Sequence, residues 1–249
     1  MDKIPILIPL GNGSTHGNDE LRYLLRSIER NAIDAGTVYL MTVYKPDWIR
    51  EGDDLVVVPL PDLYKDNKDA NLFKKTHDTL RLYGIGDFVW TADDAAILRP
   101  IELSEIPVLH NHRPNSIFYE PNQGKWRARV KDTLEWAKSI GVQLPHTYEV
   151  HCPQLFNGKA ILEGMKGVSY YPEGKTIYST WRTVTNTWQD SKSQPDYKWT
   201  FELGIDETVT VMSEKELCSK PFIGYSDATA DRVLARLAKM FPLKSKYEK

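Results

Sequence analysis

The stretch Asp87–Leu98 reads DFVWTADDAAIL and places two adjacent carboxylates where a short apolar run ends. Phe88 to Ala92 contain β-branched and aromatic residues after a Gly-Ile-Gly turn, which predicts a strand buried in a sheet. Asp93 and Asp94 then follow at its carboxyl end, which is where open α/β sheets bind ligands. Neighbouring carboxylates repel each other unless a cation, donors or solvent compensate them. The pair therefore indicates a divalent metal holding a pyrophosphate, with a solvated turn or a helix N-cap as the alternative.

The part of the chain before this stretch is predicted to contain both strands and helices in succession. Apolar runs predict strands over residues 4–10, 38–44 and 55–60. Apolar residues at helical spacing predict helices from Asn18, a plausible N-cap, to near Gly36 and over residues 69–83. This order predicts a single α/β domain with a largely parallel, Rossmann-like central sheet flanked by helices, because parallel neighbours need a crossover connection.

The second half of the chain gives weaker signals. We expect a strand over residues 148–156 and three further helices, over about residues 126–140, 159–165 and 227–241. A brief helix with a capping box from Ser213 and Glu216 is also predicted. The region from residue 170 to 199 is aromatic and polar, and we interpret it as substrate-facing. Its tryptophans are Trp181, Trp188 and Trp199.

Composition excludes several classes of protein. The chain has 249 residues, 41% of them hydrophobic and 27% charged, which is typical of a globular protein. A net charge of −2 gives no general attraction to nucleic acid. The sequence has no apolar run long enough to cross a membrane, no signal-peptide pattern and only two cysteines, so we expect a cytoplasmic protein without a membrane span.

The loop after the first predicted strand resembles a phosphate-binding turn. Gly11, Gly13 and Gly17 give GxGxxxG between a strand and a helix, where a helix N-terminus favours phosphate. The next strand ends in Tyr44 and Lys45 without the acidic residue that holds a ribose hydroxyl in dinucleotide sites. A nicotinamide site is therefore disfavoured, whereas nucleotide contact by this loop stays open.

Five segments of the chain stand in a recognisable order: IPLGNGSTHGNDELRYLLRSIERN, VYLMTVYKPDWI, NLFKKTHDTLRL, FVWTADDAAIL and YEVHCPQLFNGKAIL. Their order and spacing resemble GT-A-fold glycosyltransferases that use sugar nucleotides. The resemblance extends to small bacterial and phage members and to the Stealth capsule phosphotransferases. It covers roughly residues 4–165, with weaker matches in IYSTWRTVTN and KPFIGYSD.

This resemblance implies roles for the conspicuous residues. Asp93 and Asp94 match the family's acidic pair, which binds Mn²⁺ or Mg²⁺ on the donor diphosphate, although TADDA departs from the usual DxD form. His151 in EVHCP matches an acceptor-side element as a metal ligand or catalytic residue, with a core hydrogen bond as the alternative. Residues implied to contact the nucleotide, or able to reach a phosphate, are Pro9, Leu10, Gly11, Asn12, Gly13, Asn71, Lys75 and Arg22.

Asp227 in GYSD has two interpretations. It caps the last helix, which we favour, or it lies beside the acceptor hydroxyl as a catalytic residue. For Lys75 and Arg22 the alternative is an ordinary solvated helix face.

The expected activity is metal-dependent transfer of a sugar from a nucleotide-diphosphate sugar to a hydroxyl acceptor. Residues 1–100 would form the half that binds the sugar nucleotide, and residues 101–249 the acceptor half. The acceptor would be a glycan or, in a phage protein, a hydroxylated DNA base. Two alternatives remain: a Stealth-like sugar-phosphate transferase, which releases a nucleoside monophosphate, and a non-catalytic module that binds nucleotides or glycans through its tryptophans.

Overall fold

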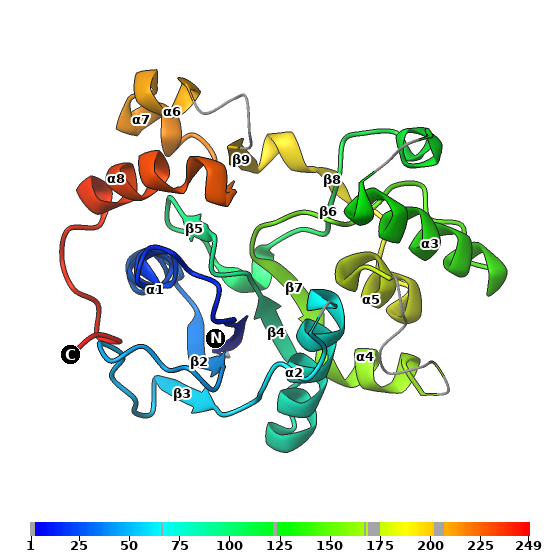
Figure 1. Ribbon diagram of the computed structural model, residues 1–249, viewed down its shortest axis with the longest axis horizontal. Coiled ribbons are helices and arrows are strands. Elements are labelled where there is room, and N and C mark those ends of the chain that lie inside the picture. The colour runs from blue at the N-terminus through cyan, green and yellow to red at the C-terminus, as the bar shows by residue number, and fades with distance from the viewer. Residues whose placement is uncertain (1–2, 66, 122–123, 167, 169–174, 202–206) are drawn as a thin grey trace.

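The computed structural model describes residues 3–65, 67–121, 124–166, 168, 175–201 and 207–249. Its centre is a five-stranded sheet in the order β3-β2-β1-β4-β7 (Figure 1). The four strands from the first half of the chain are parallel, and β7 is antiparallel to β4. The strands are β1 (Ile4–Pro9), β2 (Ala35–Met41), β3 (Leu55–Val58), β4 (Asp87–Trp90) and β7 (Gln154–Asn157). The predicted mixed α/β fold with a mostly parallel sheet is thus confirmed.

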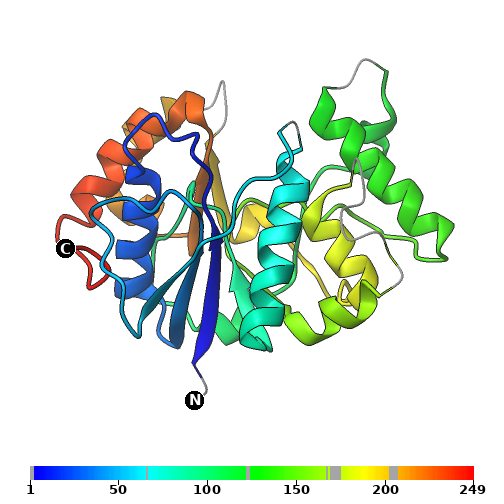
Figure 2. The same ribbon diagram turned by 60° about the horizontal axis from the view of Figure 1, so that its bottom comes forward.

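Helices cover both faces of this sheet, as Figure 2 shows. Ile6 and Ile8 of β1 pack in the cluster that contains the apolar stripe of α1 (Asp19–Asn31). Leu7 packs in the cluster that contains Phe73 and Leu80 of α2 (Lys68–Tyr83). Successive side chains of a strand point to opposite faces, so β1 is buried on both.

Two smaller sheets lie beside the central one. The first has the order β5-β10-β9, with β5 (Ala95–Ile97) antiparallel to β10 (Phe222–Tyr225) and β9 (Lys198–Phe201) parallel to it. The second pairs β6 (Leu109–His110) with β8 (Lys192–Ser193). These short strands were not predicted from the sequence.

The remaining helices belong mainly to the second half of the chain. The structure confirms the predicted capping box of Ser213 and Glu216. Among the helices that the structure describes, none is both long and apolar enough to cross a bilayer. The helices are α3 (Lys125–Ser139), α4 (Gly158–Gly164), α5 (Ile177–Thr185), α6 (Glu207–Val211), α7 (Glu214–Leu217) and α8 (Ala230–Met240), with 3-10 turns at Leu103–Glu105, Asn115–Tyr119, Gln194–Asp196 and Asp227–Thr229.

Two predictions from the second half were wrong. The strand expected over residues 148–156 is shorter and begins later: only the residues of β7, Gln154–Asn157, pair with β4. Trp181 does not face a substrate: it is fully buried, and its ring lies 5.1 to 6.3 Å from four aromatic rings of the core. Those rings belong to Phe73, Phe88, Trp90 and Phe156. Residues 170–174, at the start of the same predicted region, lie outside the described residues.

Gly224 allows the second sheet to approach the segment before β7. A Cβ atom at this position would lie 2.4 Å from the backbone oxygen of His151 and 2.7 Å from Cε of Lys198. Because the backbone oxygen cannot move aside cheaply, Gly224→Ala is expected to lower the free energy of unfolding by about 1 to 3 kcal/mol. Urea denaturation checks this prediction. Gly86→Ala is the control, since none of the described atoms lies within 4 Å of its added Cβ; equal losses in both variants would contradict the packing argument.

Candidate functional site

The acidic pair lies where the chain leaves the central sheet and enters the second one. β4 ends at Trp90 and β5 begins at Ala95, so Asp93 and Asp94 occupy the connection between them. The amide of Tyr225, at the end of β10, donates to the backbone oxygen of Asp94 over 3.2 Å. The pair is therefore fixed at the carboxyl end of β4, which is the position that the sequence predicted.

The Asp93 carboxyl group lies among other carboxylates. Burial raises its pKa, and the charges of Asp94, Glu20 and Asp227 raise it further, to about 7. A raised pKa means that the ionised form is poorly compensated by the protein itself. The site therefore has the electrostatic character that favours a bound cation.

Glu20 comes from the first turn of α1 and is held by the loop before it. Its carboxylate accepts a hydrogen bond from Ser14 Oγ at 2.9 Å and lies 3.1 Å from His16 Nδ1. The other nitrogen of His16 lies 3.0 Å from the Asp231 carboxylate on α8. Burial lowers the pKa of His16, but its hydrogen bonds to the carboxylates of Asp231 and Glu20 outweigh that effect and raise the pKa. His16 thus connects the glycine-rich loop to α1 and to α8.

Two buried polar atoms, one in the pair and one next to it, have no hydrogen-bond partner among the described residues. They are Oδ1 of Asp94 and the hydroxyl of Tyr225. Burial, together with the charges of Asp94, Glu20 and Asp93, raises the pKa of Tyr225 well above its ordinary value, so the hydroxyl stays protonated. Buried polar atoms of this kind are usually satisfied by an ion, water or ligand.

His151 does not join the acidic pair in a metal-binding group. Within the part of the chain that the structure describes, no three His, Cys, Asp or Glu side chains converge closely enough to hold an ion. The His151 side chain is exposed, next to the fully buried Cys152. Two carboxylates still suit Mg²⁺ or Mn²⁺, which in nucleotide sites take their remaining ligands from phosphates and water.

The residues predicted to contact the nucleotide divide into two groups. Pro9 and Leu10 are buried at the end of β1, and the following residues 11–13 are exposed, so this loop is open to a ligand. Asn71 instead holds the neighbouring loop: its side-chain oxygen accepts from the amides of Leu63 and Tyr64 at 2.9 and 3.0 Å, and its nitrogen donates to the Tyr64 oxygen.

Lys75 is buried, so the alternative interpretation, in which it lies on a solvated helix face, was wrong. Its ammonium group donates to the backbone oxygen of Leu10 at 3.0 Å and lies 2.8 Å from the Asp62 carboxylate. Its charge is therefore largely compensated within the protein. Lys75 fixes the end of β1 beneath the exposed loop.

Arg22 and Asp227 differ in their relation to the acidic pair. The guanidinium of Arg22 contacts Asp19, lies 3.4 Å from Glu248 and covers the Trp48 ring at 4.7 Å, so it faces away from Asp93. Asp227 is exposed and begins a 3-10 turn whose cap is Ser226, so the favoured prediction that it caps the last helix was wrong: the N-cap position of α8 belongs to Thr229. The charge of Asp227 contributes to the pKa of Asp93.

Asn18 occupies the predicted N-cap position of α1, but its side chain does not cap the helix. It precedes α1 in the left-handed conformation, with φ of 62°, and its side chain makes no capping hydrogen bond with the described residues. The Ser14 hydroxyl accepts the Asn18 amide instead, at 3.0 Å. The start of α1 is thus organised by the loop and not by its N-cap side chain.

No protein-family model matches the chain. No curated protein matches it either. The chemistry of the site is therefore interpreted from its own residues.

Glu20, His16 and Tyr225 were not predicted as site residues. Glu20 looked like an ordinary acidic residue of a first helical turn, and His16 had no metal-ligand spacing. The signal that Ser14, His16 and Glu20 shared was their closeness in the sequence. All three lie in the segment STHGNDE, which spans the end of the loop and the first helical turn. Tyr225 gave no local signal, because a long-range pairing brings it to Asp94.

Asp93→Asn is expected to stabilise the protein at neutral and alkaline pH. The pKa of Asp93 in the folded state, about 7, lies above its ordinary value of 3.8, so the folded state binds more protons between these values and loses stability as pH rises through that range. We expect a gain of roughly 1 to 2 kcal/mol at pH 8 after allowance for solvent screening, and a smaller gain at pH 5. Urea denaturation at both pH values, without divalent metal, measures it. An equal gain at both values would show that charge repulsion is not the cause.

Proposed function

We propose that this chain is a metal-dependent glycosyltransferase that moves a sugar from a nucleotide-diphosphate sugar to a hydroxyl acceptor. The observation that carries the proposal is the poorly compensated carboxylate pair, Asp93 and Asp94, at the carboxyl end of β4 in a mostly parallel sheet. A GT-A-like form of this fold and cytoplasmic activity belong to the same proposal.

In this proposal, each residue of the site has a separate role. Asp93 and Asp94 hold Mn²⁺ or Mg²⁺, and the loop after β1 binds the nucleotide against the end of the sheet. The metal ion, when bound, supplies charge stabilisation for the departing diphosphate. Ser14, His16 and Glu20 hold the loop in place through their hydrogen bonds.

Glu20 adds negative charge near Asp93, and its carboxylate contacts Ser14 and His16, so we assign it a positioning role. The acceptor half would come from residues 101–249 and would take a glycan or a hydroxylated DNA base. The chain's net charge of −2 favours the glycan.

Product analysis tests this proposal and separates it from its alternatives. A first screen measures the melting temperature with UDP-, GDP-, CDP- and ADP-sugars, each with and without Mn²⁺, because a ligand that binds only the folded state raises it. The nucleotide sugar that stabilises the protein is then incubated with a panel of glycan acceptors and with Mn²⁺.

The released nucleotide decides the reaction class. Release of a nucleoside diphosphate supports sugar transfer, whereas a monophosphate indicates transfer of a sugar phosphate by the same acidic pair. Stabilisation without any product indicates a binding module. No stabilisation by any nucleotide sugar contradicts the proposal.

A further inference from the structure

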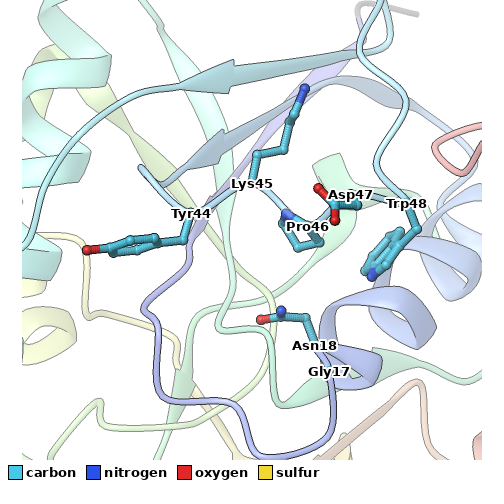
Figure 3. Close-up of a pocket in the computed structure, with 7 residues that line it drawn as sticks. All are labelled: Gly17, Asn18, Tyr44, Lys45, Pro46, Asp47 and Trp48. Atoms are coloured by element: carbon cyan, nitrogen blue, oxygen red, sulfur yellow. The ribbon is translucent and has the colours of Figure 1, made fainter.

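The loop between β1 and α1 has a hinge where it joins the helix. It comprises residues 11–17, most of which are exposed. Gly17 and Asn18 both adopt the left-handed conformation, with φ of 63° and 62°, and Figure 3 shows them where the loop enters α1. Glycine enters and leaves this conformation without a steric cost. The backbone therefore allows the loop to move about its junction with α1.

His16 connects this loop to two helices at once. Its Nδ1 lies 3.1 Å from the Glu20 carboxylate in the first turn of α1, and its Nε2 lies 3.0 Å from the Asp231 carboxylate in the first turn of α8. Figure 2 shows the loop running over α1 beside α8. Because ionised carboxylates only accept hydrogen bonds, both contacts form together only when both ring nitrogens carry a proton.

The charges that act on His16 favour its protonated form. Burial lowers the pKa of His16, but Asp231 and Glu20 outweigh burial and raise the pKa above its ordinary value of 6.5. The neutral hydroxyl of Thr15 lies 3.2 Å from Nδ1, and the loop contains no other titratable side chain. As the pH rises through the raised pKa, one ring nitrogen changes from a donor to an acceptor. One of the two contacts with a carboxylate is then lost.

The contact with Asp231 is the weaker of the two. The Asp231 side chain is 92% exposed, whereas that of Glu20 is 9% exposed and also accepts from Ser14 Oγ at 2.9 Å. Exposed ion pairs contribute little to stability, so this contact can open while the domain stays folded. The Ser14 hydroxyl also accepts the amides of His16 and Asn18, which keeps the loop attached to α1.

We propose that His16 is a proton-dependent latch that holds the loop of residues 11–17 against α8 and releases it when the imidazole becomes neutral. The loop follows β1, the strand next to β4, and Asp93 and Asp94 lie beyond the end of β4. Glu20, the second partner of His16, acts electrostatically on Asp93. Release of the loop would therefore weaken nucleotide binding beside the acidic pair. This consequence rests on the proposed function, whereas the latch itself does not.

NMR of the protein without nucleotide or metal tests the latch. Proton–carbon spectra of the histidine rings follow the titration of His16, and ¹⁵N relaxation gives the backbone order parameters of residues 14–17 at pH 6 and pH 8.5. We expect these order parameters to fall from roughly 0.85, the rigid range, toward 0.6 as the pH rises. The same fall is expected after Asp93 and Asp94 are both replaced by asparagine, because the acidic pair then no longer titrates.

Two variants remove the proton dependence in different ways. In Asp231→Asn, the amide can accept from or donate to Nε2, so the contact survives in both protonation states, and His16 should titrate at a lower pH than in the wild type. In His16→Gln, the latch contains no imidazole. Each variant is expected to have equal order parameters at both pH values. His112→Gln is the matched control: His112 is exposed and lies outside the loop, so this variant should keep the wild-type response.

A binding measurement tests the effect on the nucleotide site. The nucleotide sugar that stabilises the protein is titrated with Mn²⁺ into the wild type and into His16→Gln at both pH values. The titration of Asp93 is common to the two proteins and cancels in the ratio of their Kd values. We expect the ratio of wild type to variant to rise about twofold to fivefold from pH 6 to pH 8.5, the range for one exposed ion pair.

The outcomes separate the latch from the transferase. Equal order parameters of the wild type at both pH values, or a pH response that persists in His16→Gln, would overturn the latch. A constant Kd ratio would contradict its effect on nucleotide binding. If no nucleotide sugar binds, the proposed function fails, while the relaxation measurements still decide whether His16 is a latch.

Discussion

Replacing Asp93 and Asp94 together by asparagine is expected to lower metal-dependent sugar transfer at least about 1,000-fold, as removal of a main electrostatic group does in other enzymes. Asparagine keeps the size of the side chain but removes the charge that holds the ion. The raised pKa of Asp93 indicates that the protein alone does not compensate this charge, so the loss should appear in activity and not in stability. Initial rates of nucleotide release with saturating Mn²⁺ measure it.

The matched control is Asp87→Asn at the opposite end of β4. Asp87 is exposed and accepts a hydrogen bond from Asn157 at 2.7 Å, a bond that asparagine can retain through its own oxygen. This variant should keep its full transfer rate. Activity within tenfold of wild type in the double variant would remove the acidic pair from the mechanism.

Trp181→Ala is expected to lower the free energy of unfolding by about 3 to 5 kcal/mol, as for other fully buried tryptophans. The ring is fully buried in the cluster that joins α2, α5, β4 and β7, and the truncation leaves a cavity among four aromatic rings. A loss of this size is a large fraction of the stability of a typical domain, so the variant is expected to be partly unfolded at moderate temperature. Urea denaturation at 15 °C, followed by circular dichroism, measures the loss.

Trp126→Ala gives the contrast. Trp126 lies in the first turn of α3 and is 40% exposed, so its removal should cost less than about 1 kcal/mol. The sequence predicted a substrate-facing position for Trp181, and the structure places it in the core instead. If Trp181→Ala kept wild-type stability and lost ligand binding, the substrate-facing interpretation would be restored.

The first half of the fold was predictable because its signals are local. Continuous apolar runs such as residues 4–9 indicate strands covered on both faces, and the helical spacing of Leu21, Leu24, Leu25 and Ile28 defines the buried side of α1. The position of Asp93 and Asp94 followed from the strand before them. These predictions needed no information about distant residues.

The second half could not be predicted in the same way. The partners of β5 and β9 come from β10, which is far away in the sequence, and strands of two to four residues show no clear periodicity. In the sequence, Trp181 is one tryptophan of a polar stretch. Its burial follows only from the packing of α5 on α2. The proximity of Glu20 and Tyr225 to Asp93 likewise depends on how helix and sheets assemble.

The most direct test of the central claim is a titration of Mn²⁺ followed by electron paramagnetic resonance of the free ion, with and without the nucleoside diphosphates UDP, GDP, CDP and ADP. We predict that the wild-type protein binds one Mn²⁺, that one of these nucleotides tightens binding at least tenfold, and that the variant with both Asp93 and Asp94 replaced by asparagine binds neither ion nor complex. Equal Mn²⁺ binding by both proteins, or no binding by the wild type with any of the four nucleotides, would contradict a cation held by this acidic pair.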